Sequence, residues 1–147
     1  MKKLSSTQKA YLAGFLDGDG SIYVQAKPNT TYRYGFQIAP YVVFFQSQKD
    51  QKNFESLCSL IGFGTMRARK DGILEYIIGR HDEILEFLKI IDPYVILKKE
   101  QVVLMRKILD MKKKVGTKDD FQKLIEMIDA YRELNYSKKR KVRTLIP

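Results

Sequence analysis

The hydrophobic residues of this 147-residue chain change their spacing several times, and that alternation restricts the folds open to it. Leu12, Phe15 and Leu16 recur at helical spacing after Thr7, a possible cap, which predicts a helix to about Gly18. Apolar and polar residues then alternate strictly, as in a strand with one solvated face. Continuing this reading predicts strands at 21–27, 33–47, 65–69 and 74–78, and helical apolar faces at 54–61 and 84–91.

Two further helices are predicted near the C-terminal end of the chain. Residues 98–113 and 117–134 carry apolar side chains at helical spacing and can pack on the core. The complete αββαββα order, followed by these two helices, predicts an α+β fold with a four-stranded antiparallel sheet and helices on one face. We therefore expect one domain over residues 1–135 and a basic arm over 136–147.

The net charge of +10 is distributed unevenly along the chain. Lysines and arginines exceed the acids by one in residues 1–25, by four in 26–80 and by five in 136–147, whereas residues 81–135 are neutral. This distribution predicts that a polyanion contacts the sheet and the arm, while a neutral helical layer lies behind. Nucleic acid is the partner that we expect, although a basic surface can also serve solubility alone.

The composition disfavours several classes of protein. No apolar run is long enough to span a bilayer, and the N-terminal residues lack the apolar stretch of a signal peptide, so we expect no membrane partner. Cys58 is the only cysteine and His81 the only histidine, which argues against a disulfide framework and a zinc site. We expect no organic cofactor.

The stretch LAGFLDGDG, residues 12–20, places small residues on one stripe of the first helix. Ala10, Gly14 and Gly18 are four residues apart, and small side chains at that spacing let two helices approach closely. Because the chain holds one copy of the stretch, we expect the partner to be the same helix of a second chain, related by a two-fold axis. The alternative is that these glycines only weaken and end the helix.

Asp17 and Asp19 place two carboxylates at the C-terminal end of this helix, where negative charge is unfavourable. In a two-fold dimer the two Asp19 side chains would converge, and carboxylates that close cannot both stay ionised without a cation. Hard oxygen ligands with room for water favour Mg²⁺. A metal held against a phosphodiester polarises the phosphate, so hydrolysis of nucleic acid is the predicted chemistry.

The same nine residues resemble the motif that defines the LAGLIDADG homing endonucleases, and one motif per chain resembles the homodimeric group encoded in mobile introns. The resemblance covers almost the whole chain. It extends to KPN in the first hairpin, FQSQKDQK before the second helix, IGFG before the second hairpin, DPY followed by LKKEQ, and LNYSKKRK. It implies the family's fold and Mg²⁺ as the cofactor, with Mn²⁺ as a substitute and Ca²⁺ as an ion that binds without supporting cleavage.

The resemblance also implies catalytic residues. Asp19 matches the family's metal ligand, and the Gly18 carbonyl oxygen is its companion. Lys98, just after DPYVIL, matches the catalytic lysine, which would act on the water network or the developing charge near the cleaved phosphate. Its neighbour Lys99 matches less well.

Two positions are open for the family's active-site glutamine. Counting without gaps from the first motif favours Gln46. Gln48 is followed four residues later by Lys52, which is the family's spacing of glutamine and basic residue. We predict Gln48 and Lys52, because the register of Gln46 would put Asp50 at the basic position.

In this family the open face of the sheet lies in the DNA major groove and reads bases. Arginine suits guanine, glutamine and asparagine suit adenine, and glutamate suits cytosine. The predicted base-reading residues are Tyr23, Gln25, Lys27, Asn29, Arg33, Gln37, Arg67, Arg69 and Glu75. Four residues of the arm are predicted to contact phosphates without sequence choice, namely Lys138, Lys139, Arg140 and Lys141.

Together these features predict a homodimeric, Mg²⁺-dependent endonuclease that cuts both strands of a long, pseudo-palindromic site in double-stranded DNA. The alternatives within the same fold are a non-cleaving DNA-binding protein and an RNA maturase, because fold does not imply function. A third is a structural protein that binds nucleic acid through charge alone. The lysine-rich, tryptophan-free composition suits a protein of a chloroplast or mitochondrion, or otherwise of a prokaryotic cytoplasm.

Overall fold

The computed structural model describes residues 3–135 and 145–146, and within them it shows one antiparallel sheet covered by helices. The helices are α1 (Ser6–Asp19), α2 (Gln51–Cys58), α3 (His81–Ile91), α4 (Lys99–Lys114) and α5 (Lys118–Leu134). The strands are β1 (Gly20–Pro28), β2 (Phe36–Ser47), β3 (Thr65–Ala68) and β4 (Ile73–Ile78), and the 3-10 turn η1 (Gln48–Asp50) follows β2. The predicted α+β class and the αββαββα order are confirmed.

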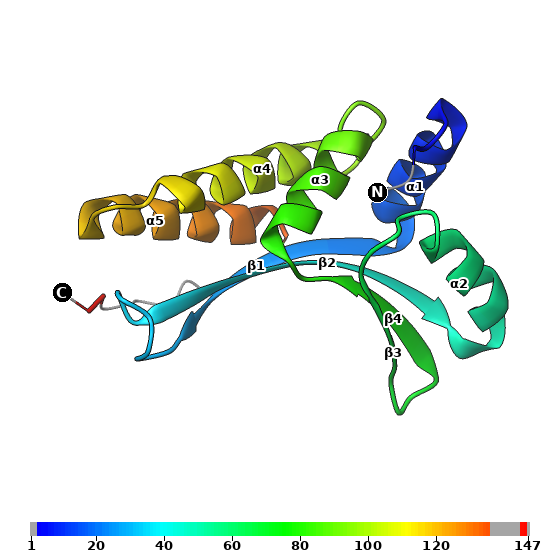
Figure 1. Cartoon of the computed structure of the whole chain (residues 1–147), viewed down its shortest axis with the longest axis horizontal. Helices are drawn as coiled ribbons and strands as arrows, with labels where there is room; N and C mark the ends of the chain where they lie inside the picture. Colours follow the sequence, from blue (N-terminus) through cyan, green and yellow to red (C-terminus); the bar gives the residue numbers. More distant parts are fainter. Residues whose placement is uncertain (1–2, 136–144, 147) are drawn as a thin grey trace.

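The four strands lie in the order β1-β2-β4-β3, so the two hairpins meet along β2 and β4. The long β1–β2 hairpin pairs from Gly20 opposite Phe44 to Pro28 opposite Phe36. Figure 1 shows the sheet as an arch with α1, α3, α4 and α5 on its convex side. Among the described residues no helix lies on the concave face, which confirms the expectation of helices on one face.

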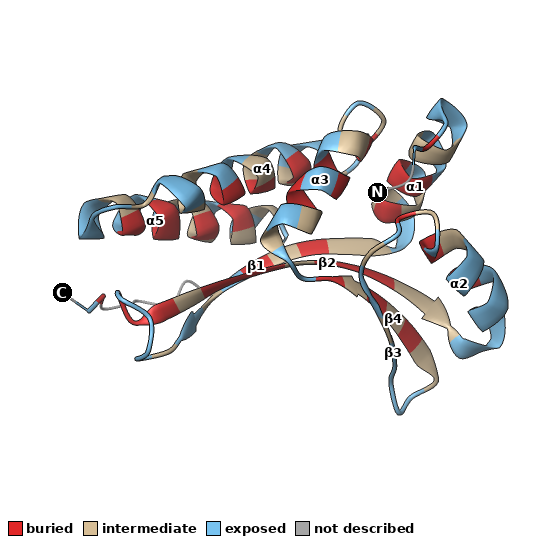
Figure 2. Cartoon of the chain, in the orientation of Figure 1, coloured by how far each residue is buried: buried red, intermediate tan, exposed pale blue. Residues whose placement is uncertain are grey.

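The hydrophobic core lies between the helices and the convex face of the sheet, where the buried sides of the helices face the strands (Figure 2). Leu16 of α1, Phe44 of β2 and Phe87 of α3 are almost fully buried there. Two residues along β1 from the partner of Phe44, the Ile22 carbonyl accepts a hydrogen bond from the buried Tyr131 hydroxyl of α5 over 2.6 Å. Helices α1, α2, α3 and α5 therefore contact the sheet directly, and α4 packs on α3 and α5.

The predicted cap of the first helix, Thr7, was wrong, because Ser5 caps it. The Gln8 backbone N–H donates to the Ser5 hydroxyl over 3.2 Å, and the Gln8 side-chain oxygen accepts from the Ser5 backbone N–H over 3.0 Å. This reciprocal pair satisfies two backbone donors that the first turn of a helix leaves unpaired. The helix also runs one residue beyond the predicted end, to Asp19.

The predicted start of the second strand, at residue 33, was also wrong, because pairing begins at Phe36. The Asn29 side-chain oxygen accepts hydrogen bonds from the backbone N–H and the hydroxyl of Thr31, which holds the chain in a turn. Gly35 has a φ of 87°, which favours glycine. Local side-chain bonds of this kind compete with strand pairing, so the loop is longer than the sequence pattern indicated.

The end of the chain packs back on this loop. Leu145 is buried, and the Ile146 backbone N–H donates to the Tyr34 carbonyl over 3.0 Å. The predicted arm residues Lys138, Lys139, Arg140 and Lys141 lie outside the described residues, so their contacts stay predictions. Among the described helices, none is long and apolar enough to cross a bilayer.

Candidate active site and nucleic-acid interface

Asp19 is the last residue of α1, and the chain passes from it directly into β1 at Gly20. A Cβ atom at Gly20 would lie 2.6 Å from the Leu16 side chain and 2.9 Å from the Leu16 Cα, so only glycine permits this junction. The Asp19 side chain is exposed and has no hydrogen-bond or ion-pair partner within the described residues. The junction therefore presents an unpaired carboxylate where α1 meets the sheet.

Asp17 has a different role, because its carboxylate binds the segment before α4. It accepts hydrogen bonds from the backbone N–H groups of Ile96, Leu97 and Lys98, over 2.8, 3.1 and 3.0 Å respectively. These bonds join residues 79 to 81 positions apart in the sequence. Since both Asp17 oxygens have partners, the argument that an acid here needs a metal applies to Asp19 alone.

Lys98 lies beside the last turn of α1, and the catalytic role that the resemblance implied for it stays a prediction. Its Nζ donates to the Asp17 carbonyl oxygen over 3.1 Å, and its side chain is half-buried. Lys99 instead donates to the backbone and the carboxylate of Asp92, which Arg106 also contacts. Burial would raise the pKa of Asp92, but the hydrogen bonds from Lys99 and Arg106 lower it overall. The geometry therefore favours Lys98 over Lys99 for a role near Asp19.

The two candidate glutamines lie on different surfaces. Gln46 pairs opposite Leu74, a core residue, so its side chain starts from the helix-covered face of the sheet. Gln48 begins the η1 turn and is exposed, and Lys52 is exposed on α2. No contact among the described residues joins Gln48 or Lys52 to Asp19. Both stay predictions, and the exposure of Gln48 supports it over Gln46.

The register of the strands places most of the predicted base-reading residues on the concave face. Ile22 and Val24 of β1 point into the core, so the residues that alternate with them point away from it. Directly paired residues of an antiparallel sheet share a face. By this rule the concave face carries Tyr23, Gln25, Lys27, Gln37, Arg67 and Glu75.

Several of these side chains are held by neighbours on the same face. The Tyr23 and Tyr41 rings lie 5.1 Å apart, and the Lys27 Nζ lies 5.4 Å from the Tyr41 ring centre. Burial is the largest cause that raises the pKa of the Tyr23 hydroxyl, and electrostatic interactions with Tyr41 and Glu75 raise it further. Glu75 in turn forms an ion pair with Arg69 over 3.5 Å. Side chains of the concave face thus contact one another within a single chain.

Sequence reasoning missed the apolar part of this face. Ala39 and Val43 are 5% and 2% exposed, yet they do not belong to the main core cluster. They lie on the concave face together with Tyr41, Phe45 and Ile77. Ala39, Tyr41, Val43 and Phe45 lie at alternate positions of β2 counted from Gln37, so they point to the same face as Gln37. The sequence alone could therefore have identified the apolar residues of this face.

Two predicted base-reading residues differ from the others. The Asn29 oxygen is engaged in the hairpin turn, which leaves its amide group for any further contact. Arg33 lies outside the strand, stacks on the Tyr34 ring at 5.2 Å and lines a cavity on the helix side of the sheet. The structure does not bring Arg33 to the concave face, because β2 begins three residues after it.

The outer face of α1 carries the predicted dimer residues. Ala10, Gly14 and Gly18 are exposed, and a Cβ atom at Gly14 or Gly18 would meet nothing within 4 Å. The three most exposed large hydrophobic residues of the described chain lie on α1 or on the segment bound by Asp17, namely Tyr11 at 61%, Ile96 at 79% and Leu97 at 76%. Small and large apolar side chains therefore share one uncovered surface.

The fold and this arrangement are those of an endonuclease class, and the chain belongs to the LAGLIDADG endonuclease family, whose pattern matches residues 12–113. The DNA endonuclease I-CreI of Chlamydomonas reinhardtii is 35% identical in an alignment of 134 residues that covers 89% of this chain and 80% of that protein. The DNA endonuclease I-CvuI of Chlorella vulgaris is 33% identical over 110 residues, which are 75% of this chain and 67% of that protein.

Solved structures of relatives have the same fold. The crystal structure of I-CvuI in complex with the I-CreI target in the presence of Mg superposes with a TM-score of 0.85 at 26% identity, covering 92% of this chain and 87% of that one. The complex of I-CvuI with its own target in the presence of Ca gives a TM-score of 0.84 at the same identity and coverage. The chain is thus homologous to site-specific homing endonucleases, which confirms the resemblance.

Proposed function

We propose that this protein is a site-specific endonuclease that binds DNA as a homodimer and cuts both strands. The observation that carries the proposal is the position of Asp19 where α1 meets β1, an exposed carboxylate without a partner among the described residues and two positions after the Asp17 carbonyl that Lys98 binds. A protein that only binds DNA gains nothing from such a group, because a carboxylate repels phosphate. The homology to I-CreI and I-CvuI supports the same activity.

The concave face is the surface that would read the DNA sequence. Gln25, Lys27 and Arg67 offer the donors and acceptors that distinguish base pairs in the major groove, and apolar side chains such as Phe45 suit the thymine methyl group. Because two copies of the chain would present this face twice about a two-fold axis, the expected target is a pseudo-palindrome. Each chain would read one half of it.

The residues at the end of α1 fit a hard divalent cation. Asp19 offers carboxylate oxygens without a competing partner, and the Gly18 carbonyl lies in the last turn of a helix, where carbonyls lack intrahelical donors. Oxygen ligands with room for water are what Mg²⁺ prefers, and Mn²⁺ and Ca²⁺ accept similar ligands. When bound, such an ion would polarise the scissile phosphate.

The neighbouring basic and polar side chains would act on the phosphate directly. Lys98 can donate to a phosphate oxygen as negative charge develops there, because its position is fixed by the hydrogen bonds to Asp17. Gln48 in η1 and Lys52 on α2 are both exposed, and they would orient solvent and balance the charge of the DNA backbone. These roles stay proposals that rest on the family resemblance.

The dimer would form through the outer face of α1. An exposed glycine in a helix costs about 1 kcal/mol relative to alanine, and within the chain nothing near Gly14 or Gly18 requires it. Close approach of a second helix is a sufficient reason for both. The exposed Tyr11, Ile96 and Leu97 would be covered in the same contact, which would bring the two Asp19 residues near each other.

The experiment compares Asp19→Asn with the unchanged protein on the DNA target recovered from a randomised library. We expect the variant to bind the target within a few-fold of the original affinity. Its cleavage rate should fall by at least roughly 10³-fold, because the group lost contributes several kcal/mol in the transition state. Asp110→Asn, an exposed acid on α4, is the matched control and should leave cleavage unchanged.

Linearisation of a plasmid that carries the target measures the cleavage, with Mg²⁺, with Mn²⁺ and without either. Unchanged cleavage by Asp19→Asn would remove the proposed role of this residue. Tight binding by the unchanged protein without any nick under all three conditions would instead indicate a non-cleaving DNA-binding protein or an RNA maturase. Cleavage of a target without two-fold symmetry would contradict the dimer.

A further inference from the structure

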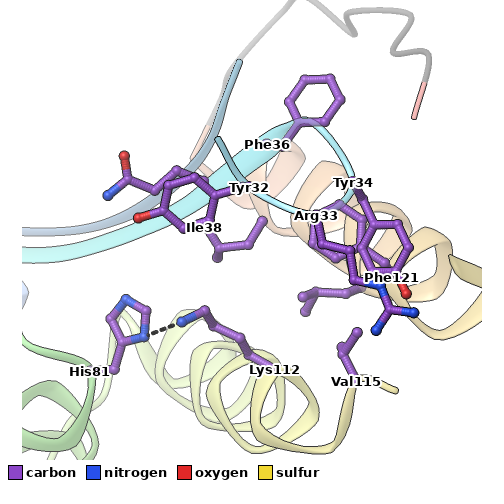
Figure 3. A pocket seen from close by; sticks show the side chains of 11 residues that line it. Tyr32, Arg33, Tyr34, Phe36, Ile38, His81, Lys112, Val115 and Phe121 are labelled. Atoms are coloured by element: carbon purple, nitrogen blue, oxygen red, sulfur yellow. Dashed lines mark hydrogen bonds between the residues drawn. The ribbon is translucent and has the colours of Figure 1, made fainter. Parts of the chain in front are cut away.

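A cavity of about 340 Å³ lies at the hairpin end of the β1–β2 ribbon, the end opposite Asp19, and on the helix side of the sheet (Figure 3). The hairpin loop, β2, the first residue of α3, the end of α4 and the start of α5 supply its walls. Its volume is within the range of small-molecule sites, about 300–1,000 Å³. None of the residues proposed to cut DNA lines it, so it is separate from the proposed cleavage site, although Gln37 of β2 also contributes to its wall.

One end of the cavity carries two basic groups. The Lys112 Nζ lies 2.7 Å from the His81 Nδ1, and Figure 3 shows the two side chains meeting there. Burial lowers the pKa of Lys112. Burial is the largest cause that lowers the pKa of His81, and the positive charge of Lys112 lowers it further. A hydrogen bond with the Ile38 backbone and the charge of Asp82 raise this pKa by less, so the pKa of His81 is lowered overall. Two nitrogen groups therefore share a partly dry site.

No acidic side chain lines the cavity within the described residues. Asp82, the acid that acts on His81, forms an ion pair with Arg80 over 3.6 Å. His81 is the first residue of α3, an eleven-residue helix whose N-terminal end carries positive partial charge. The electrostatic environment of this end thus favours an anion.

The other end of the cavity has an unsatisfied donor. Tyr34 is only 7% exposed, and its hydroxyl has no hydrogen-bond partner among the described residues. A buried polar group without a partner costs about 1–3 kcal/mol, so a ligand that accepts from it recovers that cost. The Arg33 guanidinium, which stacks on the Tyr34 ring, offers further donors at the same end.

The walls between these two ends are apolar. Ile38 and Leu124 are almost fully buried, and the Phe121 ring packs 5.1 Å from the Tyr34 ring. Flat apolar or aromatic bodies pack well against such walls. The cavity therefore combines a cationic end, an apolar middle and an end that donates hydrogen bonds.

We propose that this cavity binds a small organic phosphate with a flat body, of the size and kind of a nucleoside monophosphate. The phosphate lies against Lys112 and His81, and the body packs against Phe121. The far polar edge of the body accepts from the Tyr34 hydroxyl and from Arg33. The site is independent of the proposed DNA cleavage and is complete in one chain.

His81 makes a direct test possible, because it is the only histidine and its imidazole C–H proton gives one resolved NMR signal. The full-length protein is titrated from pH 5 to pH 8 alone, with adenosine 5′-monophosphate, with adenosine and with inorganic phosphate. A bound phosphate favours the protonated imidazole, so adenosine monophosphate should raise the pKa of His81. Adenosine monophosphate should also bind more tightly than either fragment.

Three variants separate the contacts. Lys112→Met should weaken binding of adenosine monophosphate at least roughly tenfold, because a charge-assisted hydrogen bond is lost. Lys113→Met, an exposed neighbour on α4, should leave the affinity unchanged. Tyr34→Phe should weaken adenosine monophosphate about fivefold and leave the affinity for inorganic phosphate unchanged, because its hydroxyl lies at the far end.

Three results would overturn the proposal. The first is an unchanged His81 titration with adenosine monophosphate at millimolar concentration. The second is an equal affinity of the Lys112→Met and Lys113→Met proteins for adenosine monophosphate. The third is equal affinity for inorganic phosphate and adenosine monophosphate, which would show a simple anion site without recognition of the organic body.

Discussion

The two ends of the β1–β2 ribbon are built differently. At the α1 end, the Asp17 carboxylate accepts hydrogen bonds from a distant backbone segment, and these bonds hold Lys98 against the last turn of the helix. At the hairpin end, side-chain packing of Tyr34 and Phe121 against the helix layer encloses a cavity. The first end leaves an apolar surface uncovered, which a second chain covers in our proposal, whereas the site proposed at the second end is formed by one chain. The two ends of the same pair of strands thus lead to two different proposals, one that depends on assembly and one that does not.

The largest expected effect comes from a substitution that disrupts the proposed dimer contact at the α1 end and leaves the hairpin end unchanged. Gly14→Leu is sterically free within one chain and improves helix propensity, so the isolated chain should stay folded. In a two-fold dimer the added side chain enters the interface twice, which should cost about 2–6 kcal/mol of association free energy. Sedimentation equilibrium should show a monomer, and cleavage should be lost.

Ala130→Leu, an exposed alanine on α5, is the control for this substitution and should stay a dimer. The shift that adenosine monophosphate causes in the pKa of His81 should be the same in both variants as in the original protein, because the proposed site at the hairpin end lies within one chain. A Gly14→Leu protein that stays dimeric with full cleavage would remove the helix-mediated interface.

The next effect is a difference between Asp17 and Asp19 in how much each contributes to the stability of the fold. Asp17→Ala removes the acceptor of three backbone hydrogen bonds and should destabilise the protein by about 2–3 kcal/mol. For a chain of this length, Tm should fall by roughly 5–10 °C. Asp19→Asn, at an exposed and unpaired position, should change stability by no more than about 0.5 kcal/mol.

Thermal unfolding followed by circular dichroism measures both variants. Asp17→Asn keeps one acceptor oxygen and should lie between them. If Asp19→Asn lowered Tm as much as Asp17→Ala, the division of the two acids into a structural and a catalytic group would be incorrect.

A smaller effect compares the concave face with the hairpin loop. Gln25→Ala should relax the choice of base at one position per half-site, by about 1–3 kcal/mol of discrimination. Arg33→Ala should leave base preference unchanged, because this side chain lies on the helix side of the sheet. Cleavage of a library with single-base changes measures both. Altered preference in Arg33→Ala would return this residue to the base-reading set.

The smallest effect concerns the pH dependence at the α1 end. The pKa of Asp92 is lowered in the folded protein, so this carboxylate contributes stability above its unfolded pKa of about 3.8, and the contribution is lost as the pH falls. Urea unfolding between pH 6 and pH 3 should therefore show a steeper loss of stability for the original protein than for Asp92→Asn. Parallel curves would show that the ion pairs with Lys99 and Arg106 contribute nothing measurable.

Local patterns in the sequence were sufficient to predict the elements and their order. Helical and strand periods are properties of neighbouring residues, so the segments and the polar side of β1 were predictable. The stripe of Ala10, Gly14 and Gly18 is visible for the same reason, because helical geometry alone places residues four apart on one face. Ser5 was missed as the cap, since several hydroxyl residues in succession compete for that position.

The tertiary structure alone decided what depends on distant parts of the chain. No local pattern reveals that Asp17 binds the backbone at Ile96, that β2 lies beside β4, or that Arg33 turns toward the helices. The role of a polar side chain depends on which groups the fold brings within about 3 Å of it. Sequence spacing fixes which acids stand near each other along the helix, but only the packed chain determines which of them is already bound and which is left for a partner.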